Sequence, residues 1–263
     1  MANTRYENII LENKLSEILN TELSLSQFVT VDTSLTEEAG MKKKINVYTC
    51  TGSAEDVTEG QGNTGAITMS YTPTTYTVVT TQAKFVYTDE DALTDAYLVD
   101  AGIKNLAKSM INDFNTKAIT EYEKTNNKVE YATAPSFDDF ADAIALLNVE
   151  DNGEAGYFAL VNPTMKATLR KSLKDDLKYV EAFAKAGYIG SVCGVPVYTS
   201  KVVSDDTIVI ANKEAVTAFM KKETEIEQER DADTRTNVVY GRNVKVVALT
   251  DASKAVKIVK KAQ

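Results

Sequence analysis

The sequence predicts an α+β fold in which a long helix and an extended strand pair accompany a compact unit of helices and strands. Three observations lead to this class. Residues 88–123 carry one long helical pattern, residues 45–88 carry strand patterns around a glycine-rich centre, and helix and strand signals alternate between residues 134 and 222. The patterns separate the two element types because apolar residues recur with period 3.6 in helices and period 2 in strands.

The composition is that of a globular protein with few catalytic groups. Of 263 residues, 43% are hydrophobic and 25% charged, and the formal net charge is -9. This length allows a substantial core, and the acidic balance argues against tightly held nucleic acid. Histidine is absent, which excludes Ser-His-Asp and Cys-His catalysis and His-type zinc sites. Cys50 and Cys193 are far apart, so we interpret them as small buried apolar groups in a reducing compartment.

The first 44 residues predict an arm that lies against something else. Residues 4–20 carry a short helix signal, with a capping box formed by Thr4 and Glu7. The chain start lacks the apolar core of a signal peptide, and no run approaches the ~18 apolar residues that span a bilayer. We therefore expect a cytoplasm-like location and no membrane partner.

Residues 45–88 predict a long β-hairpin with a glycine-rich tip. Gly60, Gly62 and Gly65 have the G-x-G-x-x-G spacing of a dinucleotide-binding loop. The residues that follow, 66–72, alternate as in a strand, so no helix N-terminus is available to hold a pyrophosphate. We expect no cofactor, and we assign the glycines to the turn geometry of a mobile tip. The threonine-rich second arm indicates that much of the hairpin faces water or another subunit.

Residues 88–123 give the strongest helix signal. Thr88 and Asp91 form a capping box, and apolar residues recur at helical spacing. Some 35 residues at ~1.5 Å each would reach about 50 Å, which predicts a structural spine. Gly102 either lowers the stability of this helix or marks a bend.

The region from 134 to 222 predicts a compact α/β unit. A helix begins at the Ser136 cap, a buried strand covers residues 156–161, and a second helix starts at Asn162–Pro163. Two more strands follow, and the second leads into a short helix at residues 213–221. From residue 223 onward the chain predicts strands.

The acidic clusters give no convincing active site. Asp138 and Asp142 fit a solvated helix start, and Asp231 with Asp233 lacks the glycine and glutamate of a calcium loop. Four glutamates project from one strand face toward solvent or a basic partner surface: Glu223, Glu225, Glu227 and Glu229. No P-loop, G-x-S-x-G or S-x-x-K motif has a suitable setting. We expect no catalytic, cofactor-binding or metal site, and no enzyme.

The order of these parts resembles the major capsid proteins of tailed bacteriophages, which have the Hong Kong 97-like fold. "GYFALVNPTMKATLRKSLKD" is similar to that family's strand, Asn-Pro and helix passage. "GSVCGVPVYTSKVV" is similar to its Gly-x-Pro-Val strand after the axial loop, and "TIVIANKEAVTAFMKKETEIEQERD" to its return to the periphery. The similarity spans nearly the whole chain and lies in the order of the motifs.

The resemblance implies a division of the chain and a set of assembly residues. The parts are an N-terminal arm (1–44), an extended hairpin loop (45–88), a peripheral domain with the spine helix (89–133), an inserted axial domain (134–222) and peripheral return strands (223–263). The implied assembly residues are Gly60, Gly62 and Gly65 at the hairpin tip and Gly187 and Gly190 in the axial loop.

The resemblance also implies a function. Subunits would assemble as pentamers and hexamers into an icosahedral shell, which encloses double-stranded DNA without sequence-specific binding. The shell would form in the host cytoplasm and become part of the virion, with a portal and a separate scaffolding protein as partners. Because the arm begins near Met1, we expect a full-length mature subunit. Two alternatives are an encapsulin-type nanocompartment shell and a dinucleotide-binding enzyme, the latter resting on the glycines alone.

Overall fold

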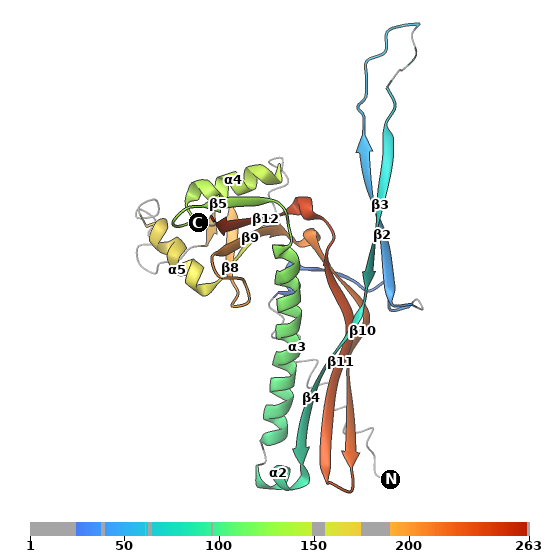
Figure 1. Ribbon diagram of the computed structural model, residues 1–263, viewed down its shortest axis with the longest axis vertical. Helices are drawn as coiled ribbons and strands as arrows, with labels where there is room; N and C mark the ends of the chain where they lie inside the picture. The colour runs from blue at the N-terminus through green and yellow to red at the C-terminus, as the bar shows by residue number, and fades with distance from the viewer. Residues whose placement is uncertain are drawn as a thin grey trace.

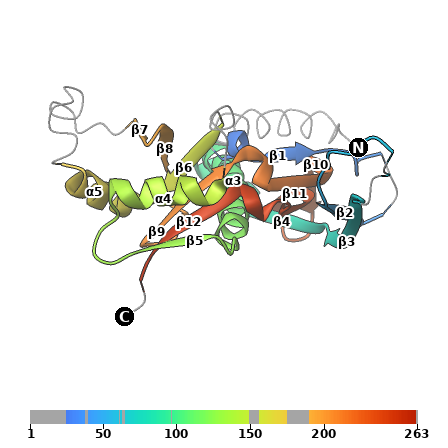
Figure 2. The same cartoon turned by 90° about the horizontal axis from the view of Figure 1, so that it is seen from above.

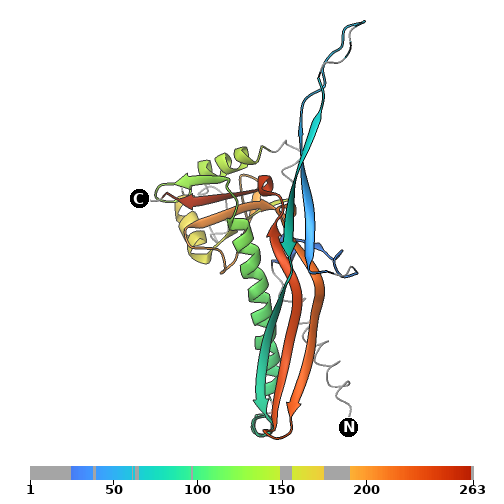
Figure 3. The ribbon, with the colours of Figure 1, turned by 45° about the vertical axis from the view of Figure 1, so that its right-hand side comes forward.

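The computed structural model describes residues 25–37, 40–60, 62, 65–95, 97–148, 156–174 and 190–261. The described strands form three sheets in an elongated molecule (Figure 1). A six-stranded sheet with helices forms a compact unit, a four-stranded sheet runs beside a long helix, and a two-stranded ribbon extends away from both (Figures 1 and 3).

The described elements follow in this order: η1 (Ser26–Phe28), β1 (Thr30–Asp32), β2 (Lys42–Thr51), β3 (Thr68–Thr77), β4 (Val79–Thr88), α2 (Asp89–Thr94), α3 (Leu98–Glu123), β5 (Lys128–Tyr131), α4 (Phe137–Leu147), β6 (Tyr157–Val161), α5 (Pro163–Ser172), β7 (Ser191–Val192), β8 (Val195–Thr199), β9 (Thr207–Asn212), η3 (Lys213–Ala215), β10 (Val216–Asp231), β11 (Thr236–Leu249), η4 (Ala252–Lys254) and β12 (Ala255–Lys260).

The helix predicted over residues 88–123 is present as two helices. The capping box is formed as predicted, since the Asp91 N–H donates to Thr88 Oγ1 at 3.1 Å and the Thr88 N–H donates to the Asp91 carboxylate at 3.3 Å. At Asp95 the backbone is extended, and its carboxylate accepts a hydrogen bond from the Tyr97 N–H at 2.9 Å. This local bond ends α2 and positions the start of α3, whose 26 residues span about 39 Å.

The N-terminal half of α3 packs on the four-stranded sheet, whose order is β1-β10-β11-β4. Two glycines set the close approach. A Cβ on Gly102 would lie 2.3 Å from the Phe85 ring on β4, and a Cβ on Gly241 would lie 2.6 Å from Leu106 and 3.0 Å from Met110. Gly102 therefore serves packing against the sheet, and α3 continues through it.

The C-terminal half of α3 packs on one face of the six-stranded sheet, whose order is β5-β12-β9-β6-β8-β7. Its Ile119 and Tyr122 share a core cluster with Phe158 and Val209 of that face. Helices α4 and α5 cover the opposite face, which carries Ile208, Ile210, Val256 and Ile258 (Figure 2). The Thr125 hydroxyl donates to the Ala255 carbonyl at 2.8 Å. Helix α3 therefore packs against both sheets, through separate apolar clusters in its N-terminal and C-terminal halves.

The α/β unit differs in extent from the predicted residues 134–222. Its sheet takes β5 from before that segment and β12 from the C-terminal end of the chain. The helix predicted at residues 213–221 is the three-residue turn η3, after which β10 begins at Val216 and joins the other sheet. The predicted caps are formed, with Ser136 Oγ accepting from the Asp139 N–H and Asn162 Oδ1 from the Thr164 N–H.

The hairpin is shorter than the predicted residues 45–88. Strands β2 and β3 pair antiparallel from Lys42–Thr77 to Thr51–Thr68, and the described residues between Thr51 and Thr68 lie in the loop that joins them. Strand β4, predicted as part of the second arm, pairs instead with β11. The change of sheet occurs at Val78, whose side chain is buried and whose N–H donates to the Met41 carbonyl at 2.9 Å. The threonine-rich pattern correctly predicted that residues 79–88 form a strand, but it did not predict that this strand pairs with β11.

Candidate functional site

The outer part of the ribbon formed by β2 and β3 is exposed along its whole described length. Every described residue from 50 to 73 is exposed. Met69 and Tyr71 alternate along β3, and Ile67 continues this alternation directly before the strand, so the period-2 pattern puts all three on one face; they are 65% (Ile67), 63% (Met69) and 62% (Tyr71) exposed. Three large apolar side chains on one face of an isolated ribbon are a surface suited to another protein, because a two-stranded ribbon is not stable alone.

The glycines predicted at the hairpin tip differ in conformation. Gly60 has a φ of +84°, which favours glycine, whereas Gly62 is outside the left-handed region. The Gly65 N–H donates to Glu55 Oε1 at 3.0 Å across the loop. Gly52 was not predicted as a turn residue, but its φ is +118° and a Cβ there would lie 2.9 Å from the Ala66 carbonyl oxygen. Turn geometry therefore accounts for Gly60 and Gly52.

The two predicted axial-loop glycines are only partly described. Gly187 lies outside the described residues, and the Gly190 carbonyl accepts a hydrogen bond from the Val197 N–H at 3.1 Å beside the β7–β8 hairpin. In that hairpin turn, Cys193 is half-buried and has a φ of +49°. Cys50 on β2 is exposed, so the interpretation of both cysteines as buried groups is wrong for Cys50.

Helix α2 is held against the β10–β11 turn by charged groups. Asp89 accepts from Arg230 at 2.7 Å and from Asn237 at 2.6 Å, and Arg235 pairs with Glu90 at 2.9 Å. The Arg230 hydrogen bond lowers the pKa of Asp89 below its usual range. None of the six residues of α2 is buried. The ion pairs therefore fix in place a short helix that buries no side chain of its own.

Two apolar side chains are presented at this end of the molecule. Leu93 on α2 is 87% exposed, and Tyr97, which precedes α3, is 78% exposed. Together with the ribbon residues, they are among the most exposed large apolar side chains described. Figure 1 places α2 and the β2–β3 ribbon toward opposite ends of the long axis.

Two of the four alternating glutamates on β10, Glu225 and Glu227, have basic partners within the chain. Arg242 on β11 pairs with Glu227 at 3.1 Å and also with Glu225. Lys222 lies 2.5 Å from Glu225, and this hydrogen bond lowers the pKa of the Glu225 carboxyl. Arg242 and Lys222 therefore neutralise two of these four acidic groups within the chain, whereas one prediction was that this face meets a basic surface on another molecule.

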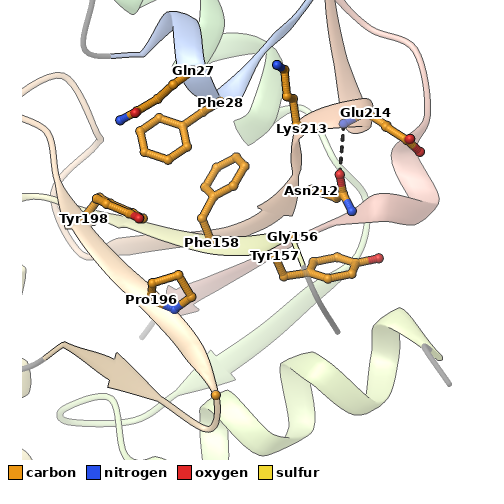
Figure 4. A pocket seen from close by; sticks show the side chains of 11 residues that line it. Gln27, Phe28, Gly156, Tyr157, Phe158, Pro196, Tyr198, Asn212, Lys213 and Glu214 are labelled. Carbon is orange, nitrogen blue, oxygen red and sulfur yellow. Dashed lines mark hydrogen bonds between the residues drawn. The ribbon is translucent and has the colours of Figure 1, made fainter. Parts of the chain in front are cut away.

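A cavity of about 650 Å³ opens between η1, β6, β8 and η3 (Figure 4). Its aromatic side chains include Phe28, Phe158 and Tyr198, and the Phe28 ring lies 4.5 Å and 4.8 Å from the other two. On the polar side, Asn212 Oδ1 accepts from the Glu214 N–H at 3.1 Å, and Lys254 pairs with the Glu214 carboxylate. The Asn212 side-chain oxygen and the Glu214 carboxylate at the cavity are therefore already engaged by neighbouring groups of the chain.

A buried polar cluster lies between α3 and β11. Lys245 is 6% exposed, and its ammonium lies 4.8 Å from the centre of the Phe114 ring. Burial lowers the pKa of Lys245 to about 8. The Oδ1 atoms of Asn115 and Asn243 are also buried, and neither has a hydrogen-bond partner in the described part of the chain. The strand pattern that includes "NVKVV" gave no sign of a buried lysine.

Neither a metal-binding cluster nor a membrane-spanning helix occurs among the described residues. No group of three or more acidic, histidine or cysteine side chains there could hold a metal ion. None of the described helices combines the length and the apolar character needed to cross a membrane.

Comparisons with known proteins give a consistent result. A family model described as phage capsid protein matches residues 71–258. No curated protein matches the sequence. Among solved structures, the capsid of the native GTA particle is similar with a TM-score of 0.75 and 13% identity, over 91% of this chain and 90% of that chain.

Two further structures extend this similarity. A structure described as Mycobacterium phage Che8 matches with a TM-score of 0.64 and 20% identity, over 89% of this chain and 90% of that one. A virus-like particle from Pyrococcus furiosus matches with a TM-score of 0.65 and 13% identity, over 96% of this chain and 99% of that one. At these identities the matches establish a shared fold.

Proposed function

Because the chain belongs to the phage capsid protein family, we propose that it is the major capsid protein of a tailed double-stranded DNA bacteriophage. Its subunits would assemble as pentamers and hexamers into an icosahedral shell around the genome. The observation that carries this proposal is the exposed ribbon, with Ile67, Met69 and Tyr71 on one face. Such a ribbon gains its order from a neighbouring subunit.

We assign the parts of the fold to roles in that shell. Helix α3 and the four-stranded sheet would be the peripheral domain, with α3 as its spine, and the six-stranded sheet with α4 and α5 would be the axial domain. The β2–β3 ribbon would be the extended loop, in which Gly60, Gly62 and Gly65 adapt the tip to inequivalent positions. The segment 1–44 would be the arm, and Gly187 and Gly190 would line the axial contacts.

The partners follow from the same role. The main partner is the subunit itself, with a portal and a separately encoded scaffolding protein. With a net charge of -9, the subunit would enclose DNA without gripping its phosphates. The role is structural rather than enzymatic, and it places the protein in the virion after assembly in the host cytoplasm.

The second candidate is a nanocompartment shell that encloses cargo proteins. The similarity to the Pyrococcus furiosus virus-like particle over 99% of that chain favours it. The contents of native particles separate the candidates, since nuclease-protected DNA of genome length indicates a phage shell and enclosed protein indicates a compartment.

Deletion of residues 54–65 tests the role of the ribbon. We expect the deleted subunit to stay folded and soluble, because the described residues in this stretch are exposed, but to form no closed particles. Electron microscopy and sedimentation of the two proteins would measure this. Normal shells from the deleted chain, or failure of the full chain to form any shell, would count against the proposal.

A further inference from the structure

The outer face of α4 carries two carboxylates that have no partner of their own. Asp138 and Asp142 are four residues apart, so they share one side of the helix, and both are exposed. Neither forms an ion pair or a side-chain hydrogen bond within the described part of the chain. The adjacent Asp139, in contrast, accepts a hydrogen bond from the Ser136 N–H at 2.7 Å in the helix cap. Capping therefore accounts for Asp139 but not for the other two acids.

Small and apolar side chains complete this face of α4. Ala141 and Ala145 are exposed beside the carboxylates, and their small size allows another helix to approach closely. Phe137 and Leu146 are 48% and 52% exposed, and at 3.6 residues per turn they lie on opposite edges of the face. A helix face with exposed apolar side chains and two uncompensated carboxylates is suited to a basic partner surface.

The outer face of α5 carries the opposite charge. Arg170 and Lys171 in its last turn and Lys174 just beyond it are exposed. None of the three forms an ion pair or a side-chain hydrogen bond within the described part of the chain. Ala167, three and four residues before Arg170 and Lys171, is exposed on the same side and again leaves room for a close approach. This end of α5 is therefore a basic surface on a chain whose net charge is -9.

The two faces match when the helices run antiparallel. Asp138 lies in the first turn of α4, and Lys174 follows the last turn of α5, so antiparallel helices bring these ends together. Asp138 and Asp142 are about 6 Å apart along the helix axis, and Arg170 and Lys174 have roughly the same spacing. Parallel helices would instead place the acids opposite the start of α5, whose first three residues are uncharged.

The two faces are not paired with each other within one subunit. No ion pair joins α4 to α5 in the described part of the chain. Figure 1 places α4 along the upper side of the compact unit and α5 at its left end. Because the two faces are different patches, a contact between them in two copies is head-to-tail, the type that produces rings when the rotation closes. A second copy of the chain is thus a partner that both faces fit.

We propose that α4 of one copy docks antiparallel on α5 of the next, with Asp138 and Asp142 facing Lys174 and Arg170. This proposal rests on the proposed function and specifies one contact between the compact units around a symmetry axis of the shell. The same charges also suit the dipoles of their own helices, since acids lie near the N-terminus of α4 and bases near the C-terminus of α5. That effect needs no second copy, so the two roles give different results on charge reversal.

Charge reversal separates the contact from an effect on the single helix. The variants D138K/D142K and R170E/K174E should each form at least tenfold fewer closed particles than the unaltered chain, as measured by sedimentation and electron microscopy. The variant with all four changes should recover particles, because the pairs are restored with opposite polarity. If the charges act only on their own helix dipoles, the fourfold variant should instead have the lowest thermal midpoint and recover no particles.

A matched control accounts for the change in net charge. The variant K201E/K213E changes two exposed lysines of the same compact unit that lie outside both helices. Like R170E/K174E, it lowers the net charge by two units per residue, from -9 to -13. It should assemble normally, because neither lysine belongs to the proposed contact.

A disulfide test shows whether the contact joins two subunits. Both chains carry Cys50→Ser and Cys193→Ser; one also carries Asp142→Cys and the other Arg170→Cys. Mild oxidation of particles assembled from the mixture should give a cross-linked dimer on denaturing gels, whereas particles of either chain alone should give none.

Three results would count against the contact. Normal assembly of both double reversals, with no cross-linked dimer, would overturn it and leave the capsid proposal intact. Loss of particles with R170E/K174E that the fourfold variant does not recover, again without a cross-linked dimer, would also overturn it, because α5 would then have a different acidic partner. Failure of the unaltered chain to form shells would overturn this contact and the capsid proposal together.

Discussion

Replacement of Gly102 by alanine should destabilise the subunit, although alanine is the better helix former. Gly102 lies within α3, is buried and is not in the left-handed region. Helix propensity alone would therefore predict a gain of about 1 kcal/mol in the free energy of unfolding. The Phe85 ring lies so close to Gly102 that we expect a loss of stability instead of this gain.

The magnitude follows from the gap between α3 and β4. The new Cβ would lie 2.3 Å from Cε1 and Cζ of Phe85, whereas carbon atoms pack at about 3.5–4.0 Å. Either α3 withdraws by more than about 1 Å or the ring moves and loses its contacts with the helix. The ring is also stacked on Tyr87, with centroids 5.5 Å apart. Overpacking of this kind costs about 1–3 kcal/mol, so the net loss should be up to about 2 kcal/mol after the propensity gain.

Urea unfolding of the unassembled subunit measures the effect, and the background Phe85→Ala supplies the control. With the ring removed, Gly102→Ala should stabilise the subunit by about 1 kcal/mol, because only the propensity gain remains. The sign of the change should therefore differ between the two backgrounds. A similar stabilisation in both would show that α3 and β4 do not approach as closely as described, and would refute the reasoning.

Other predictions concern charge and capping. Burial lowers the pKa of Lys245 to about 8, below the usual lysine value of about 10.4. The unfolded state therefore binds the extra proton between these values, and subunit stability should rise with pH across that window by up to about 3 kcal/mol. Lys245→Met should remove this rise and increase stability at pH 7, as measured by urea unfolding at several pH values; an unchanged rise would show that another group causes it. Arg242→Ala should lower the thermal midpoint at low salt, because Glu225 and Glu227 then repel each other, and the difference from the unaltered chain should shrink at ~0.5 M salt; a salt-independent difference would contradict an electrostatic origin. Ser136→Ala should lower the free energy of unfolding by about 1 kcal/mol through loss of the α4 cap, while Ser136→Asp should retain it; equal losses in the two variants would argue against capping.

Local signals in the sequence predicted the elements whose causes are themselves local. The caps at Thr88, Ser136 and Asn162 depend on residues two or three positions away, and all three are formed. The end of α2 was missed, although it too is local, because Asp95 occurs in a pattern that otherwise favours continued helix. Its side-chain bond to the Tyr97 N–H is one of several conformations open to aspartate.

Partners that are distant in the chain could not be predicted from such signals. Period-2 alternation identified β4 as a strand, but its pairing with β11 rather than with the hairpin depends on contacts more than 140 residues apart. The same holds for β12, whose place beside β9 extends the α/β unit beyond the predicted segment. Of the candidate site, the glycine-rich tip was found from sequence, whereas the exposed face of α2–α3 required the fold to show which residues remain uncovered.

The passage of the chain through Val78 has a mechanical consequence. Strands β3 and β4 are separated by this one residue, and its side chain is clamped among Leu35, Phe219, Val244 and Ala248. A bend of the backbone at Val78 would therefore swing the whole ribbon about the edge of the four-stranded sheet. Thr68 is ten residues, or about 33 Å, from Val78, so a bend of about 10° at Val78 moves Thr68 by about 6 Å. Because β4 is hydrogen-bonded to β11 along its length, a load applied to the ribbon tip is delivered to the sheet beneath α3.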